Sequence, residues 1–192
     1  MPTPNPAALE FLRTRRSRPA KTLTTPVPER AALLPLLEAA ARTPDHGKLE
    51  PWRFIVLERL ALVRLAEATR SHGNAIGIDP DKLAKSVLQF SDAHLAVAVI
   101  SSPKPSDKIP EIEQVLSAGA ACLALLNAAL ATGWGANWLT GWMAHDTAFC
   151  ETHLGLQAGE TVAGFIHVGT ETAAPPERPR PDLDAITTWV SA

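Results

Sequence analysis

The chain has 192 residues, of which 46% are hydrophobic, and a formal net charge of −2 at pH 7. That apolar content is enough for the core of one domain, and we expect a single domain over residues 1–192. The balance of 18 basic and 20 acidic residues offers no strongly basic surface, so neither nucleic acid nor an anionic membrane is an expected partner.

Helical and strand-like segments follow one another along the chain without a regular βαβ alternation. Apolar spacing, bulk and turn residues predict helices over residues 7–14, 28–42, 59–71, 80–90, 111–132 and 145–154, and strands over 52–57, 94–101, 136–139 and 161–168. Pro28 suits the first turn of the second helix. The order favours the α+β class, with helices packed on a small sheet.

Residues 115–144 contain no Asp, Glu, Lys or Arg, and a stretch of this length could span a bilayer. Gly133-Trp134-Gly135 interrupts it, which instead predicts a helix buried on all sides followed by a turn and a strand. The first residues lack the basic and apolar regions of a secretory signal, and two cysteines are too few for a disulfide framework. We therefore expect no membrane association and a cytoplasmic location.

Three segments contain residues suited to ligand chemistry, and the first is Arg15-Arg16-Ser17. No acidic residue occurs between Glu10 and Glu29, whereas five basic residues do. Planar guanidinium donors and a hydroxyl at the end of a helix are suited to a dianionic phosphate. The alternative interpretation is a basic face exposed to solvent.

The second segment is Arg42-Thr43-Pro44-Asp45-His46, where Pro44 ends the preceding helix. A cation and an imidazole at one corner could hydrogen-bond a polar ligand. Alternatively, Arg42 only complements the helix dipole and His46 makes one structural bond.

The third segment runs from Gly133 to Gly141 and has glycines at 133, 135 and 141. Its glycines permit a close approach of the backbone to a flat ligand. Trp134, Trp138 and Trp142 are spaced by four, so the alternative is a continuous buried helix with the three indoles on one face.

Taken together, these segments resemble the nitroreductase-like FMN flavoproteins, in particular their compact branch of about 180 residues. The resemblance extends from Leu9 to about Pro181. It rests on five motifs in order: Arg-Arg-Ser at 15–17, Arg-x-Pro-Asp-His at 42–46, Glu-Pro-Trp at 50–52, Gly-x-Gly at 133–135 and Gly-Phe-x-x-x-Gly-Thr at 164–170. Their joint occurrence favours the ligand-binding interpretation of each segment.

The resemblance implies a mixed sheet flanked by helices and an intertwined homodimer with FMN at the subunit interface. Arg15, Arg16 and Ser17 would hold the phosphate and ribityl end, and Arg42 and His46 would reach the same flavin from the other subunit. The remaining implied contacts are with the isoalloxazine, from Trp138, Leu139 and Thr140, and with the nicotinamide path, from Ala128 to Gly133. Relatives often have Arg at the position of Leu139, so a polar contact to the cofactor is expected to be weaker here. They often have Gln at the position of Glu50, whose negative charge near the flavin is expected to lower the flavin potential.

The implied activity is an NAD(P)H-dependent oxidoreductase. NAD(P)H would deliver hydride to FMN, and a small-molecule acceptor such as a nitroaromatic, a quinone or an activated alkene would then take the electrons. The flavin supplies the chemistry, so no catalytic side chain is expected. Two alternatives remain, namely a protein that binds or stores FMN without useful turnover and a cofactor-free dimeric interaction protein.

Overall fold

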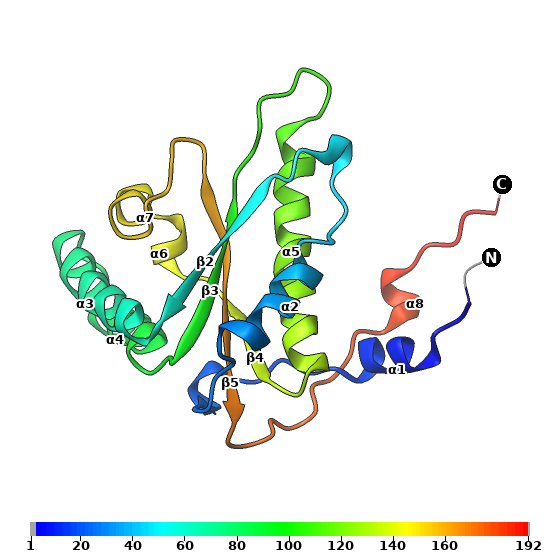
Figure 1. Cartoon of the computed structure of the whole chain (residues 1–192), viewed down its shortest axis with the longest axis horizontal. Helices are drawn as coiled ribbons and strands as arrows, with labels where there is room; N and C mark the ends of the chain where they lie inside the picture. Colours follow the sequence, from blue (N-terminus) through cyan, green and yellow to red (C-terminus); the bar gives the residue numbers. More distant parts are fainter. Residues whose placement is uncertain (1–2, 192) are drawn as a thin grey trace.

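The computed structural model describes residues 3–191, which form a sheet with helices on both faces (Figure 1). The helices are α1 (Pro6–Thr14), α2 (Arg30–Ala40), α3 (Arg59–Ala75), α4 (Pro80–Ser91), α5 (Glu111–Ala131), α6 (Trp142–His145), α7 (Thr147–Leu154) and α8 (Leu183–Ile186), with 3-10 turns η1 (Ala20–Thr22) and η2 (His46–Lys48). The strands are β1 (Leu23–Thr24), β2 (Trp52–Glu58), β3 (Leu95–Ser101), β4 (Gly135–Leu139) and β5 (Thr161–Glu171). The α+β class is confirmed.

Strand β5 is the centre of the sheet. It pairs with β3, with β4 and, near its C-terminal end, with the short β1, whereas β2 pairs with β3. Every one of these pairings among residues 3–191 is antiparallel, so the expectation of a mixed sheet is wrong for the single chain. The paired strands that follow one another in the chain are connected through helices, β2 to β3 through α3 and α4, and β4 to β5 through α6 and α7.

The sheet separates two apolar cores because side chains alternate along its strands. In β3, which is buried throughout, Ala96, Ala98 and Ile100 pack with one core, and Leu95, Val97 and Val99 with the other. Helices α3, α4, α6 and α7 cover the first face, and α2 and α5 cover the second (Figure 1). The two-sided burial explains why residues 94–101 lack polar alternation.

Several helices and strands begin or end at other residues than predicted, for local reasons. The second helix begins at Arg30 rather than at Pro28, because Pro28 precedes the N-cap residue Glu29. The helix predicted over 145–154 begins at Thr147, since Asp146 takes an extended conformation and caps α7 by accepting from the amide of Phe149 at 2.7 Å. The short helix α6 that precedes it was not predicted. The last strand continues through Gly169 to Glu171, where it pairs with β1, a strand that was not predicted.

The charge-free stretch 115–144 does not form one continuous element. It contains most of α5, a turn, strand β4 and the start of α6. Helix α5 is long and apolar enough to cross a membrane, but eight of its side chains, from Gln114 to Ala129, are buried within the chain. The interruption after Ala131 leads from a helix into a strand, as predicted. The expectation that this helix is buried on all sides is wrong for the single chain, because Ile112, Leu116 and Leu123 of α5 are exposed.

Candidate functional site

The three residues after α1 form a compact donor cluster. Asn5 caps α1 by accepting from the amide of Ala8 at 3.1 Å, and the helix ends at Arg15, whose amide donates to Phe11 O at 2.8 Å. Nη2 of Arg15 donates to Oγ of Ser17 at 2.9 Å, and Nη1 of Arg16 donates to Ser17 O at 3.4 Å. Both arginines therefore donate to Ser17, Arg15 to its hydroxyl and Arg16 to its main-chain oxygen.

The donors of this cluster are incompletely used. Nε of Arg15 and Nε of Arg16 are buried and have no hydrogen-bond partner. Burial, together with the positive charges of Arg180 and Arg16, lowers the pKa of Arg15. Buried polar groups normally have partners, so unpartnered guanidinium N–H groups in a positive surrounding indicate a place for an anion.

Arg180 is a member of this cluster that sequence reasoning missed. It lies in the proline-rich C-terminal tail, and its charge acts on Arg15 although the two residues are far apart in the chain. Glu177 pairs with Arg180 at 2.8 Å and is the carboxylate that the tail brings to these guanidinium groups. Three arginines against one glutamate leave a net positive charge.

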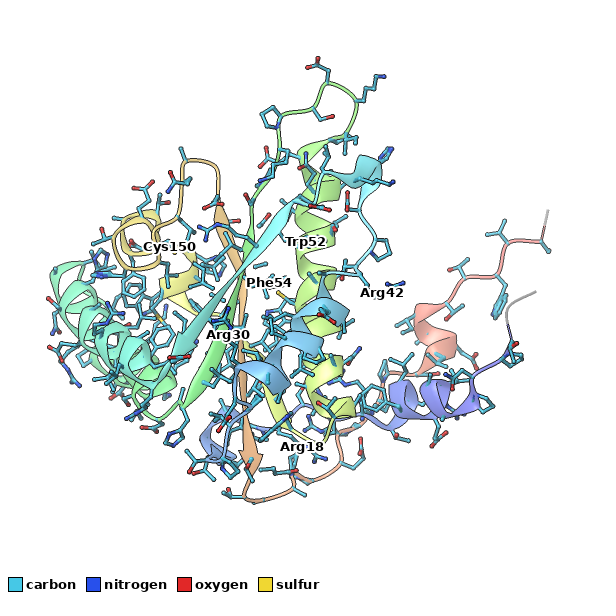
Figure 2. All side chains as sticks on the ribbon, in the orientation of Figure 1. Arg18, Arg30, Arg42, Trp52, Phe54 and Cys150 are labelled. Carbon is cyan, nitrogen blue, oxygen red and sulfur yellow. The ribbon has the colours of Figure 1, made fainter. Side chains whose placement is uncertain are left out.

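The segment after the cluster connects it to the sheet. We call residues 15–24, which comprise the cluster and this connecting segment, the N-terminal arm. The amide of Arg18 donates to Ala136 O at 2.8 Å, and Nδ2 of Asn137 donates to Arg18 O at 2.8 Å. The Arg18 side chain also pairs with Glu171 at 3.3 Å, at the foot of the sheet (Figure 2). These bonds place the arginine cluster next to β4 of the same chain.

Strand β4 carries two of the three residues predicted to line a flat ligand. Trp138 and Leu139 are half-buried in β4, and Thr140 is exposed directly after it. The indole N–H of Trp138 donates to Ala163 O at 3.3 Å, and the indole lies where a side chain on Gly164 would be. The Trp138 ring is thus engaged with β5 and the α5 core, which leaves chiefly the main chain of β4 for a ligand.

Gly164 permits this packing, and we predict that Gly164→Ala is destabilising. Its new methyl group would overlap the Trp138 indole, and overpacking typically costs about 1–3 kcal/mol. In a Trp138→Leu background the same substitution should cost clearly less, because the overlapping ring is gone. Urea unfolding of the four proteins measures this coupling; equal losses in both backgrounds would show that the indole is not the obstacle.

The three tryptophans do not share a helical face. Trp134 precedes β4, Trp138 is within it and Trp142 begins α6, so the alternative of one continuous helix is wrong. Gly133, with φ of +88°, turns the chain after α5, and Gly141, with φ of +143°, turns it after β4. Ala128 is half-buried near the end of α5, one turn before Gly133. The predicted residues of this segment therefore lie near the end of α5, in the turn that follows it, and in or directly after strand β4.

Arg42 and His46 are located away from the arginine cluster. Arg42 is exposed on the connection between α2 and β2, whereas Arg18 lies at the foot of the sheet (Figure 2). Nδ1 of His46 is 2.8 Å from Oε2 of Glu113 at the start of α5, and Ser117 donates to Pro44 O at 2.9 Å. Among residues 3–191, no hydrogen bond or ion pair joins Arg42 or His46 to Arg15, Arg16 or Ser17.

A hollow of about 510 Å³ between α2 and strands β2 and β3 contains none of these residues. Its floor is apolar, with Leu33, Leu37 and Leu95, and Nη1 of its Arg59 already donates to Ser91 O at 2.6 Å and to Ala93 O at 2.7 Å. Its lining also contains two carboxylates, Glu29 and Glu58, so it is a poorer place for a phosphate than the arginine cluster.

The nitroreductase family model matches residues 12–170. The chain belongs to the nitroreductase family. The chain is 35% identical over 164 residues to a Haemophilus influenzae protein named as an NAD(P)H nitroreductase, an alignment that covers 85% of this chain and 88% of the relative. It is 32% identical over 163 residues to the Escherichia coli K12 protein named NAD(P)H nitroreductase YdjA, with 85% and 87% covered.

Solved structures of related proteins have the same fold as this chain. A nitroreductase-like protein from Bacillus cereus superposes with a TM-score of 0.79 at 23% identity, and the match covers 100% of both chains. A nitroreductase from Desulfovibrio desulfuricans, whose structure is a complex with FMN, gives 0.73 at 25% identity and covers 98% of this chain and 99% of its own. The predicted nitroreductase-like fold is thereby confirmed, and it includes the N-terminal arm and the C-terminal tail.

Proposed function

We propose that this nitroreductase is an NAD(P)H-dependent oxidoreductase that binds FMN, with residues 1–192 acting as a single domain. The observation that carries the proposal is the arginine cluster, in which two buried guanidinium Nε atoms have no partner. Its donor set suits a phosphate monoester, because several charged N–H groups and one hydroxyl converge there. The name of the FMN-containing Desulfovibrio desulfuricans relative supports the same cofactor.

The roles of the residues follow from their positions. Arg15, Arg16 and Ser17 hold the phosphate, and Arg180 adds charge to them from the tail. The main chain at Trp138, Leu139 and Thr140 lines the flat ring, and Gly141 lets the backbone come close to it. Ala128 to Gly133 border the path of the nicotinamide. When bound, FMN supplies hydride chemistry, and the protein supplies position and electrostatics.

Arg42 and His46 contribute to the site from a second subunit, because within one chain they lie apart from the arginine cluster. We therefore propose a homodimer. Its contact surface would include large apolar side chains that one chain leaves exposed on α1, α5 and the tail, namely Leu9, Leu12, Ile112, Leu116, Leu123, Leu183, Ile186, Trp189 and Val190. Apolar exposure of this extent is typical of an interface that is normally covered.

The dimer leads to a paired prediction on two exposed leucines. Leu116→Glu, on the outer face of α5, should weaken the dimer at least about 100-fold, because an unpaired carboxylate would be buried in the contact at a cost of several kcal/mol. Leu60→Glu is the control, since Leu60 is 81% exposed on α3 at the other face of the sheet. Sedimentation velocity at submicromolar protein measures both; a monomeric parent protein, or equal effects of the two variants, contradicts the proposal.

The function is tested first by the colour and the chromophore of the purified protein. Released chromophore should run with FMN and not with FAD on chromatography. A colourless protein that also fails to take up added FMN contradicts the proposal and favours a cofactor-free interaction protein.

Turnover is tested separately. Anaerobic reduction of the bound flavin by NADH and by NADPH, followed by addition of a nitroaromatic, a quinone or an activated alkene, should give reduction and then reoxidation. We propose these three classes as acceptors. Uptake of FMN without reduction by either nicotinamide would instead indicate a protein that stores the flavin.

A further inference from the structure

The imidazole of His167 is buried and has no hydrogen-bond partner. This residue belongs to the central strand β5, its exposed fraction is 2%, and neither Nδ1 nor Nε2 has a partner. Burial lowers the pKa of His167 to about 4. A buried imidazole with two unsatisfied nitrogens is unusual and calls for an explanation.

The N-terminal arm covers part of this histidine. A small cavity of about 10 Å³ next to His167 is lined from the arm by Ala20, Leu23 and Thr24. Such a volume is too small for the several waters that a charged imidazole would require. While the arm is in place, the ring can therefore be accommodated only in its neutral form.

Burial alone lowers the pKa of His167, and no charged neighbour contributes to the shift. Its cross-strand partners are Ala96 in β3 and Asn137 in β4. The segment before β3 contributes His94 to the cavity, and this is the one other titratable side chain of its lining. The charged residues that fix the arm to β5, Arg18 and Glu171, pair with each other at 3.3 Å. A proton on His167 would therefore add an uncompensated positive charge to an apolar surrounding.

Of the elements around His167, the arm is held by the fewest bonds. Strand β1 has only two residues in register with β5, whereas β3 and β4 pair over six and five positions. The remaining polar contacts of the arm are the two bonds of Arg18 with β4, the ion pair of Arg18 with Glu171 at 3.3 Å, and two bonds to Thr22 O, each at 2.9 Å, from the amide and the hydroxyl of Thr172. Displacement of the arm is consequently the least costly way to expose the ring to water.

We propose that His167 is an acid-sensitive latch beneath the N-terminal arm, so that protonation of its ring releases residues 18–24 from the end of β5. Arg15, Arg16 and Ser17 directly precede this segment, so release would also disorganise the arginine cluster. That second consequence rests on the proposed function, whereas release of the arm itself does not.

The expected size of the effect follows from proton linkage. An exposed imidazole has a pKa of about 6.5, so the released state binds the proton more tightly than the docked state. The docked arm is fully favoured above that value and becomes less favoured as the pH falls toward about 4. The fraction of released arm should rise about 30-fold between pH 7.5 and pH 5.

Hydrogen exchange of the purified full-length protein tests the latch. Peptides covering residues 18–24 should lose protection between pH 7.5 and pH 5, after correction for intrinsic rates, while peptides of β3 keep theirs. His167→Leu should abolish this acid response, and His167→Gln serves as a second variant that cannot titrate. His94→Gln is the matched control, because it removes the other histidine of the same cavity, and it should keep the response.

Three results would overturn the latch. These are an unchanged acid response in both His167 variants, its loss in His94→Gln, and a simultaneous loss of protection in β3, which would mean global unfolding. Retention of FMN, followed by flavin fluorescence over the same pH range, is a separate measurement. If the arm is released while FMN stays bound, the latch is supported and the phosphate role of the arginine cluster is wrong.

Discussion

Arg15→Ala should weaken FMN binding by roughly 30-fold to several thousand-fold. The guanidinium of Arg15 lies beside Ser17 with an unused buried Nε, in a surrounding made positive by Arg16 and Arg180. Removal of one charged partner from a desolvated charge pair costs about 2–5 kcal/mol, which corresponds to that range of dissociation constants. Titration of flavin-free protein with FMN, monitored by quenching of flavin fluorescence, measures the change.

Two comparisons separate a phosphate contact from a general loss of charge. Arg13→Ala removes an equal charge from the last turn of the same helix, but Arg13 is exposed, so FMN affinity should change little. Riboflavin lacks the phosphate and should bind the parent protein and the Arg15 variant equally poorly. If the Arg15 variant loses affinity for both ligands to the same degree, or for neither, the Arg-Arg-Ser segment is only a basic face in solvent.

Leu62→Ala should lower the free energy of unfolding by about 2–5 kcal/mol. Leu62 has an exposed fraction of 0% and belongs to the core between α3 and the sheet. Its truncation removes apolar contacts and leaves a cavity that tightly packed neighbours can only partly fill. That loss is a large part of the usual stability of a domain, which is about 5–15 kcal/mol.

Leu60 offers the matched comparison for this core prediction. It lies two residues earlier in the same helix and is 81% exposed, so Leu60→Ala changes the same side chain with little change in burial. The exposed substitution should stay within about 0.5 kcal/mol of the parent. Chemical unfolding at one fixed protein concentration keeps any dimer contribution constant. Similar losses at both positions would mean that α3 does not pack on the sheet as described.

Local patterns were sufficient for the long elements but not for those made by distant contacts. The apolar run of residues 94–101 and the helix over 111–132 were predicted nearly to their ends. Strand β1 was not, because its two residues become a strand only by pairing with Thr170 and Glu171. For the same reason, Gly169 and Thr170 were expected to end a strand that in fact continues through them.

Prediction of the site was limited in the same way, because its residues also depend on contacts between distant parts of the chain. The chemistry of Arg15, Arg16 and Ser17 alone did not distinguish a phosphate site from a solvated face, and family resemblance decided between them. Arg180 carried no local signal, since its contribution depends on how the tail folds back along the chain. His167 was one of six scattered histidines, and only the packed sheet makes it distinctive.

The central position of β5 has a consequence during synthesis. Strand β3 is finished at residue 101, but the strand that covers its second edge begins only at residue 161. At about 5–20 residues per second, that edge waits roughly 3–12 s for its partner. The exposed edge is the uninterrupted apolar sequence Leu-Ala-Val-Ala-Val-Ile, which is typical of segments that pair with other chains. Nascent chains that stop before β5 should therefore aggregate or require a chaperone, whereas completed chains close this edge themselves.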